Sequence, residues 1–328
     1  MSSTVASLNG WMLETIVEID QHRPGFAGTY LRSSNERRQV IAAFCAVQKD
    51  QEALRKDADF LLAARHQTVL AKAFRRVPTG LRGALARAGA QPHDKRFYSV
   101  LARTLTSPPH ARVVQAINQL SSIDLTRLRI LRMLPPEVCA PAVVEALDDV
   151  RTTKDAVALV ELIVSSGVDR QALATAITAV SNKAQLGRLW DRWAARCHFP
   201  APPVHSGVGY HAISNGVELR EMVRRYQNCS MRYLVEVLNG FSAFGVFPSE
   251  SGEAGMVVHL RLRAGRWEIE GFYGKHNSRP DRADRERATR FLISAGVAER
   301  TTVKNPSGPW DALRRLNARW MYEVDEDD

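Results

Sequence analysis

An interruption at residues 199–209 constrains the fold of this chain more than any other feature of its sequence. The segment, FPAPPVHSGVG, holds three prolines and two glycines. Proline removes a backbone hydrogen-bond donor and glycine favours turns, so neither a helix nor a strand is expected to continue through the segment. The sequence therefore predicts a linker here, between a first domain over residues 1–198 and a second over residues 210–328.

The first domain is expected to consist of short helices. Apolar residues recur at helical spacing, for example at Val40 and Phe44, and glycines and prolines separate successive patterns. Ser34, Asp124 and Asp169 precede such patterns and are predicted to cap the helices that follow. We expect an irregular all-α domain, arranged either as an irregular helical array or as a packed bundle.

The second domain has a different pattern, which predicts an antiparallel meander with helices around it. Apolar and polar residues alternate in the second of three strand-like runs, and residues 263–266 between the second and third runs are typical of a tight turn. The predicted helices span about 217–226, 230–238, 281–294 and 310–322, and the predicted strands span 242–247, 256–263 and 267–273. The fold class is thus α+β overall, with an acidic tail over residues 323–328.

The second domain also carries an ordered set of residues that is typical of a known family. A helix leads into Asn-Cys, a tyrosine follows, a glycine precedes a strand, and the meander ends in Gly-x-x-Asn before a proline. These positions are Asn228, Cys229, Tyr233, Gly240, Gly274, Asn277 and Pro280. With this set, residues 200–296 resemble the C-terminal region of PcfJ-like proteins. The resemblance implies an association with plasmids and other mobile elements, including conjugation, and it implies no particular biochemical activity.

Basic residues in the first domain indicate a surface that binds nucleic acid. Residues 55–103 carry 11 Lys and Arg against three Asp, and Arg outnumbers Lys in the chain by 37 to 8. Guanidinium groups bind phosphate bidentately, which suits a phosphate backbone. A merely solvated basic face is the alternative. The candidate nucleic-acid-binding residues are Arg65, Lys72, Arg75, Arg76, Arg82, Lys95, Arg96 and Arg279, with Phe74, Phe97 and Tyr98 as side chains for stacking.

A catalytic cysteine is one competing hypothesis. Cys229 follows Asn228 at a break between two predicted helices, where a side chain can be presented. It would act as a nucleophile if neighbouring arginines or a base, His259 or His276, promoted its deprotonation. The alternative is structural, with Asn228 capping the next helix and Cys229 buried as a small apolar residue.

The loop that follows the third predicted strand is a second candidate site. Residues 274–279 include His276, Asn277 and Arg279, which could present groups to a substrate or hold phosphate with the help of backbone amides. The alternative is a strand-to-helix connection in which Asn277 is left-handed and Pro280 opens the next helix.

Metal and cofactor chemistry is not indicated. Glu268 and Glu270 share one face of a predicted strand, and we expect that face to be exposed rather than to bind a divalent ion. The cysteines form no CxxC pair, so they are expected to be reduced. A zinc site is not expected either, because the spacings between the cysteines and histidines of this region match no standard zinc site. These residues are Cys197, His198, His205, His211 and Cys229.

These patterns lead to one main functional hypothesis and two alternatives. No apolar run is long enough to cross a membrane and no signal peptide is recognised, so a cytoplasmic protein without a membrane partner is expected. The main hypothesis is a nucleic-acid or nucleoprotein-binding factor, without a cofactor, that is associated with mobile elements or with defence against them. The alternatives are an enzyme that uses Cys229 or the 274–279 loop, and a scaffold for a protein partner.

Overall fold

The chain forms two compact units in the computed structural model. The structure describes residues 10–48, 50–106, 111–248, 255–299 and 308–321, so the predicted acidic tail lies outside the described residues. Unit 1 comprises residues 1–153 with 180–183, and unit 2 comprises residues 154–179 with 184–328. The segment predicted as a linker, residues 199–209, lies inside unit 2. The compact units and the domains expected from the sequence are therefore divided at different residues.

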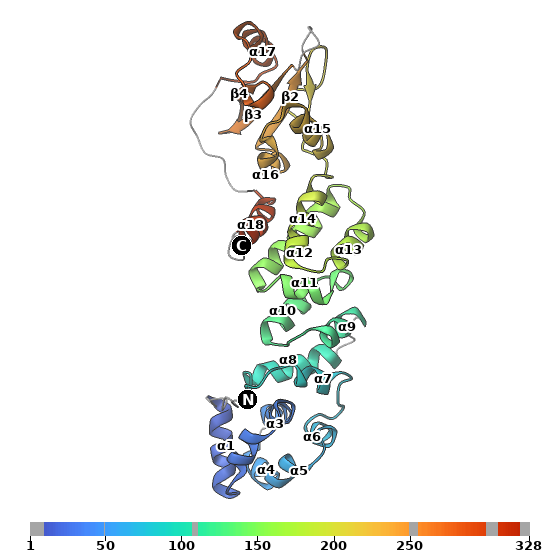
Figure 1. Ribbon diagram of the computed structural model, residues 1–328, viewed down its shortest axis with the longest axis vertical. Helices are drawn as coiled ribbons and strands as arrows, with labels where there is room; N and C mark the ends of the chain where they lie inside the picture. Colours follow the sequence, from blue (N-terminus) through green and yellow to red (C-terminus); the bar gives the residue numbers. More distant parts are fainter. Residues whose placement is uncertain (1–9, 49, 107–110, 249–254, 300–307, 322–328) are drawn as a thin grey trace. The chain divides into compact units, whose positions relative to one another are not determined.

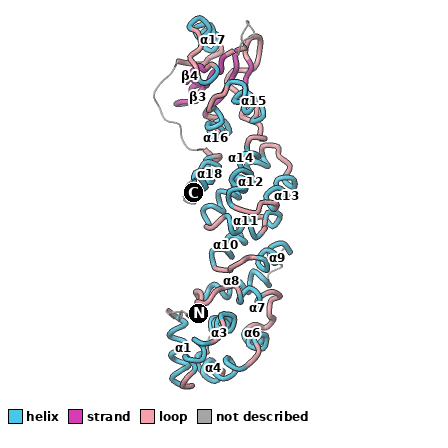
Figure 2. The backbone as a smooth tube through the Cα atoms, viewed as in Figure 1, coloured by secondary structure: helices cyan, strands magenta, loops and turns pink. Residues whose placement is uncertain are grey.

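The described part of unit 1 consists of helices and the loops between them. Figure 2 shows helices and loops there, with the strands confined to unit 2. The predicted caps are present, because the side chains of Ser34 and Asp124 accept hydrogen bonds from the backbone amides of Arg37 and Arg127. The helices of unit 1 are α1 (Trp11–His22), α2 (Phe26–Arg32), α3 (Asn35–Val47), α4 (Gln51–Lys56), α5 (Ala58–Ala63), α6 (His66–Ala73), α7 (Leu81–Ala86), α8 (Lys95–Thr106), α9 (Ala111–Gln119), α10 (Leu125–Met133), the 3-10 turn η1 (Pro136–Val138), α11 (Pro141–Ala146) and the start of α12 (Val150–Ser165).

Helix α3 forms the centre of the N-terminal part of unit 1. Residues 38–45 are buried one after another, so the helix is enclosed on all sides rather than on a single stripe. Helices α2, α6, α7 and α8 pack against it (Figure 1). This arrangement is a bundle packed around a central helix, which favours the bundle over the helical array in this part of the chain.

A buried polar network fastens α3 to the segment before α8. The Gln39 side chain is fully buried and donates to the carbonyl oxygens of Gly89 (3.0 Å) and Gln91 (2.6 Å). Its Oε1 accepts a hydrogen bond from the Tyr98 hydroxyl at 2.8 Å, and that hydroxyl accepts one from the His93 amide. Because buried polar groups are costly unless they are paired, this network fixes one orientation of α8 on α3.

Unit 2 combines helices with one four-stranded sheet. The cap predicted at Asp169 is present, since its side chain accepts from the Ala172 amide. The elements are the rest of α12, α13 (Arg170–Thr178), α14 (Lys183–Ala194), β1 (His211–Ala212), α15 (Gly216–Tyr226), the 3-10 turn η2 (Ser230–Tyr233), α16 (Leu234–Leu238), β2 (Ser242–Phe247), β3 (Met256–Arg263), β4 (Arg266–Tyr273), the 3-10 turn η3 (Lys275–Asn277), α17 (Arg282–Ser294) and α18 (Asp311–Met321).

The sheet is the predicted antiparallel meander with one additional strand. Its order is β1-β2-β3-β4, and every neighbouring pair is antiparallel. Strands β2, β3 and β4 occupy the predicted runs, and Ala264 and Gly265 in the turn between β3 and β4 both have positive φ, as a tight hairpin requires. The short strand β1 was not expected. The α+β class predicted from the sequence is confirmed.

Helices cover both faces of the sheet (Figure 1). On one face, Val258 and Leu260 of β3 belong to the same core as Ala288 and Leu292 of α17. On the opposite face, α16 packs against β2, and Tyr233 of η2 contacts aromatic rings of the sheet. Packing on this second face therefore holds the segment that contains the predicted Asn-Cys pair in position.

Glu268 and Glu270 are not on an exposed strand face, so that expectation was wrong. His259 pairs with Gly271 and Leu260 pairs with Ile269, which leaves Glu270 as an extra residue in β4. Both carboxylates interact with the buried Arg263, and Glu268 is only 3% exposed. The bulge and this ion-pair cluster together explain why two acidic residues face the interior.

The polar network of α3 gives a stability prediction with an internal control. Tyr98→Phe should lower the free energy of unfolding by about 1 to 3 kcal/mol, because the Gln39 Oε1 would lose its buried partner. Tyr30 is equally buried, but its hydroxyl has no hydrogen-bond partner among the described residues. Tyr30→Phe should therefore leave stability nearly unchanged. Urea unfolding followed by circular dichroism measures both, and equal effects of the two substitutions would contradict the role assigned to Gln39.

Candidate nucleic-acid interface

Part of the predicted basic surface of unit 1 is free to bind an anion. Arg65, Arg75, Arg76 and Arg96 are exposed, and none forms an ion pair within the part of the chain that the structure describes. Arg65 precedes α6, Arg75 and Arg76 follow it, and Arg96 lies in the first turn of α8. Helices α6 and α8 both pack on α3, which fixes where these side chains emerge.

Other members of the predicted set already have partners. Lys72 forms an ion pair with Asp57, and Arg82 contacts Glu36 at 2.6 Å. The ammonium group of Lys95 lies 5.0 Å from the centre of the Trp11 ring. The carboxylates partly neutralise the charges of Lys72 and Arg82, and the Trp11 ring holds the ammonium group of Lys95. All three side chains are therefore less available to phosphate.

The aromatic side chains expected to stack on bases do not form a stacking surface. Phe97 and Tyr98 are both fully buried in the core of unit 1, where their rings meet edge to face at 5.1 Å. The helical pattern of α8 explains the error, because both residues lie on the apolar face that packs toward α3. Phe74 is half-buried.

A second set of arginines, on α14 of unit 2, is more closely organised. The apolar residues of this helix, including Leu186, Trp190 and Trp193, are buried at helical spacing. Arg188 and Arg192 lie four residues apart on the opposite side and are exposed. Arg196, just after the helix, is also exposed and lies with its guanidinium 4.4 Å from the centre of the Trp193 ring.

Helix α15 begins in direct contact with the end of α14. The Asn215 side chain caps α15 by accepting from the amides of Val217 and Glu218. A Cβ atom on Gly216 would lie 2.1 Å from the Ala195 carbonyl oxygen, so the two segments can approach only because residue 216 is glycine. The amide of Phe199 donates to the Ser214 carbonyl, which closes the chain between the two helices.

This junction brings the arginines of the two helices together. Arg220 extends from α15 to the C-terminal end of α14, where a guanidinium nitrogen lies 3.5 Å from the Arg192 carbonyl oxygen. Helix C-termini attract cations, which favours this position. Arg224 is exposed one turn farther along α15. We call Arg188, Arg192, Arg196, Arg220 and Arg224 the α14–α15 arginine surface.

The α14–α15 arginine surface carries positive charge that is not neutralised by ion pairing. In the described residues, none of its five arginines forms an ion pair with a carboxylate. Asp191 and Glu221 lie three residues from Arg188 and Arg224 on the same helices, so they lower the net charge of the surface without forming an ion pair with these arginines in the described chain. The four-residue spacing from Arg188 to Arg196 is visible in the sequence. Its continuation onto α15 depends on the contact at Gly216, which no local pattern reveals.

The predicted catalytic residues do not form a hydrogen-bonded nucleophile–base pair in the described part of the chain. Cys229 is exposed, unlike Cys45, Cys139 and Cys197. The Asn228 side chain accepts from the Ser230 amide at 3.1 Å, which agrees with the capping alternative. Within the described chain, no hydrogen bond joins Cys229 to His259 or to His276. The expectation that Cys229 is buried was wrong, because it lies at the surface where α15 ends.

His259 is a buried neighbour of aromatic rings rather than an accessible base. Its ring stacks on Phe244 at 4.5 Å between centres and lies 4.6 Å from that of Tyr233. Its Nε2 is 3.1 Å from the Ser242 hydroxyl. Only 1% of the residue is exposed, so a bound substrate could not reach the imidazole.

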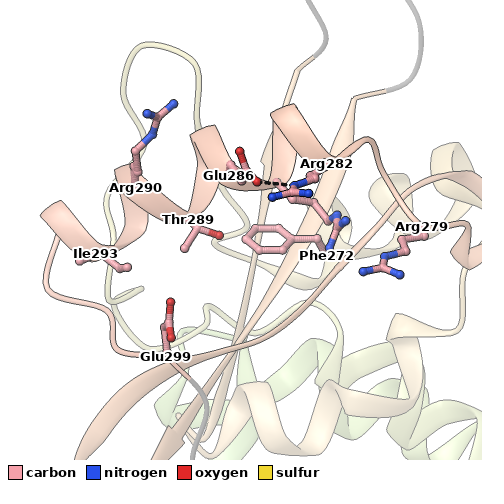
Figure 3. Close-up of a pocket in the computed structure, with 9 residues that line it drawn as sticks. Phe272, Arg279, Arg282, Glu286, Thr289, Arg290, Ile293 and Glu299 are labelled. Carbon is pink, nitrogen blue, oxygen red and sulfur yellow. Dashed lines mark hydrogen bonds and ion pairs between the residues drawn. The ribbon is translucent and has the colours of Figure 1, made fainter.

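The 274–279 loop is closed by its own backbone. The Gly274 amide donates to the Ser278 carbonyl at 2.8 Å, and the Ser278 amide donates to the Lys275 carbonyl. These two amides are therefore occupied and do not cradle phosphate. His276 and Asn277 both have positive φ, which confirms the left-handed conformation expected for Asn277. Helix α17 begins at Arg282 rather than at Pro280. Arg279 leaves the loop and lines a pocket beside α17 (Figure 3).

Comparison with known proteins finds no relative for the chain. No family model matches it, and neither the curated proteins nor the solved structures include a significant match. The resemblance of residues 200–296 to PcfJ-like proteins thus stays a prediction. In the described residues, no three His, Cys, Asp or Glu side chains gather as metal ligands would. None of the described helices is long and apolar enough to cross a membrane.

The environment of His259 gives a prediction for the pH dependence of stability. Burial, together with the nearby Arg261, Arg263 and Arg232, lowers the pKa of His259 from 6.5 to about 3. The unfolded chain therefore binds a proton near pH 6.5 that the folded chain does not, so the stabilisation present above this pH is lost as the pH falls toward 3.

His259→Phe should remove this dependence. Relative to the variant, the native protein should lose about 1 kcal/mol of stability per pH unit between about pH 6 and about pH 4. Urea unfolding of both proteins across this range measures the difference, and parallel pH profiles would contradict the buried, neutral state of His259.

Proposed function

We propose that this protein binds the phosphate backbone of nucleic acids, and that the α14–α15 arginine surface makes the principal contacts. The observation that supports this proposal is a set of five neighbouring arginines that have no carboxylate partner in the described residues. Most other arginines of unit 2 with a defined contact form ion pairs, for example Arg170 with Glu161 and Arg315 with Asp155. The α14–α15 arginine surface is therefore a part of unit 2 where several neighbouring arginines have no ion pair among the described residues.

The chemistry of arginine supports a polyanion as the partner. A guanidinium group donates two parallel hydrogen bonds to a phosphate and is less strongly hydrated than an ammonium group. Each phosphate that is neutralised releases condensed counterions, which contributes affinity without requiring a particular base sequence. Exposed arginines on two helices fixed to each other meet these requirements without any conformational change.

The wider role follows as part of the same proposal. Arg65, Arg75, Arg76 and Arg96 of unit 1 would extend the phosphate contacts. The PcfJ-like pattern supports a nucleic-acid or nucleoprotein-binding role in the cytoplasm, connected with a mobile element or with defence against one. Catalysis is not part of the proposal, because Cys229 has no hydrogen-bonded base among the described residues.

Replacing two arginines of the α14–α15 arginine surface should weaken binding and reduce its salt dependence. Arg192→Ala with Arg196→Ala should lower the affinity for a labelled oligonucleotide about tenfold or more at low salt. The slope of log affinity against log salt should become shallower by about 0.7 for each phosphate of a single strand that the variant no longer neutralises, or by about 0.9 for each phosphate of a duplex. Fluorescence anisotropy with single-stranded DNA, duplex DNA and RNA across a salt series measures both quantities.

A matched double variant controls for net charge. Arg170→Ala with Arg287→Ala removes the same charge from exposed positions whose arginines are ion-paired, and it should bind almost as the native protein does. Equal decreases in affinity for both variants, or no binding at low salt, would overturn the proposal. Cleavage of the labels that Cys229→Ser abolishes would favour the enzyme, and salt-insensitive capture of a protein partner would favour the scaffold.

A further inference from the structure

A pocket separate from the α14–α15 arginine surface lies between α17 and the β4 side of the sheet. Its volume is about 710 Å³, within the range of small-molecule sites. Arg282, Glu286, Thr289 and Ile293 line it from α17 at the spacing of one helix face. Phe272 of β4 lies between these residues and Arg279 in Figure 3.

The pocket contains both engaged and unengaged arginines. Arg282 forms an ion pair with Glu286 at 2.6 Å, and Arg285 donates to the Pro280 carbonyl at 3.1 Å. Arg279 and Arg290 also line the pocket, and neither has a hydrogen bond or ion pair within the described chain. In Figure 3 the Arg290 side chain extends away from Phe272, whereas Arg279 lies beside the ring, so Arg279 is available to an anionic ligand that contacts Phe272.

The other lining residues argue against a simple anion as the ligand. The Phe272 ring is half-buried and packs with its inner side against the core beneath α17. Ile293 adds an apolar surface that is 48% exposed. Glu299 contributes a carboxylate that has no partner among the described residues and would repel a bare anion. A fitting ligand must combine negative charge, a flat apolar group and hydrogen-bond donors.

We propose that this pocket binds a phosphorylated nucleotide. The phosphate would contact Arg279, the base would lie against Phe272, and a sugar hydroxyl or base amino group would donate to Glu299. Stacking of a base on an aromatic side chain is tolerant of base identity, so the pocket would accept nucleotides of several kinds. The nucleotide is either free or the phosphorylated end of a strand, since both offer the same groups.

Calorimetric titration of the full chain with AMP, adenosine and inorganic phosphate tests this assignment. AMP should bind at least about tenfold more tightly than either fragment, because only AMP engages both the Arg279 guanidinium group and the Phe272 ring. Arg279→Ala and Phe272→Leu should each weaken AMP binding about tenfold. Arg287→Ala changes an ion-paired arginine of α17 that does not line the pocket, so AMP should bind that variant as it binds the native protein.

Competition distinguishes the two sources of the nucleotide. A short oligonucleotide with a 5′-phosphate that displaces AMP more effectively than its unphosphorylated counterpart identifies a strand end, and equal, weak displacement identifies a free nucleotide. The double variant of Arg192 and Arg196 should keep full affinity for AMP, so failure of the proposed phosphate-backbone surface is separable from failure of this pocket. Absence of AMP binding in the millimolar range, or phosphate binding as tight as that of AMP, would overturn the proposal.

Discussion

The contact between Gly216 and the Ala195 carbonyl is the constraint on which the arrangement of unit 2 depends. Any side chain at position 216 would collide with backbone, because even a Cβ atom would lie 2.1 Å from the oxygen. Backbone cannot swing away as the end of a flexible side chain does. The glycine therefore sets how closely α15 approaches α14. Since α15 also leads into the segment that covers the sheet, the same contact positions the arginines and the Asn-Cys pair.

The distribution of charge separates structural arginines from those available for binding. Arg263 is buried, and Glu268 and Glu270 compensate its charge within the sheet. Arg192 and Arg224 lie on exposed helix faces with no carboxylate partner in the described residues. A high arginine content by itself therefore indicates little, because the same residue type stabilises the interior in one place and leaves uncompensated positive charge in another.

Features governed by local chemistry could be predicted from the sequence. Strand β3 follows from alternation and its hairpin to β4 from a glycine turn, and the caps at Ser34 and Asp124 follow from side chains that accept hydrogen bonds from nearby amides. Features governed by tertiary contacts could not. The two residues of β1 exist as a strand only because β2 pairs with them, and the buried Glu268 has its ion-pair partner, Arg263, on the neighbouring strand β3.

The candidate site shows the same division. Basic residues could be recognised in the sequence, but the ion pair that occupies Lys72 of α6 involves Asp57, which lies between α4 and α5. The α14–α15 arginine surface spans the proline-rich segment that suggested a domain boundary, so the sequence pattern argued against joining its two halves. The pocket beside α17 likewise combines residues of β4, α17 and the chain after α17, which only the folded structure brings together.

Photochemical cross-linking of an oligonucleotide to the protein, followed by mass spectrometry of the attached peptides, tests the central claim most directly. The account predicts cross-links concentrated in peptides from α14 and α15, around Arg192, Arg196 and Arg224, and their disappearance at high salt. Cross-links that avoid both helices, or that persist unchanged at high salt, would contradict a phosphate-binding role for the α14–α15 arginine surface.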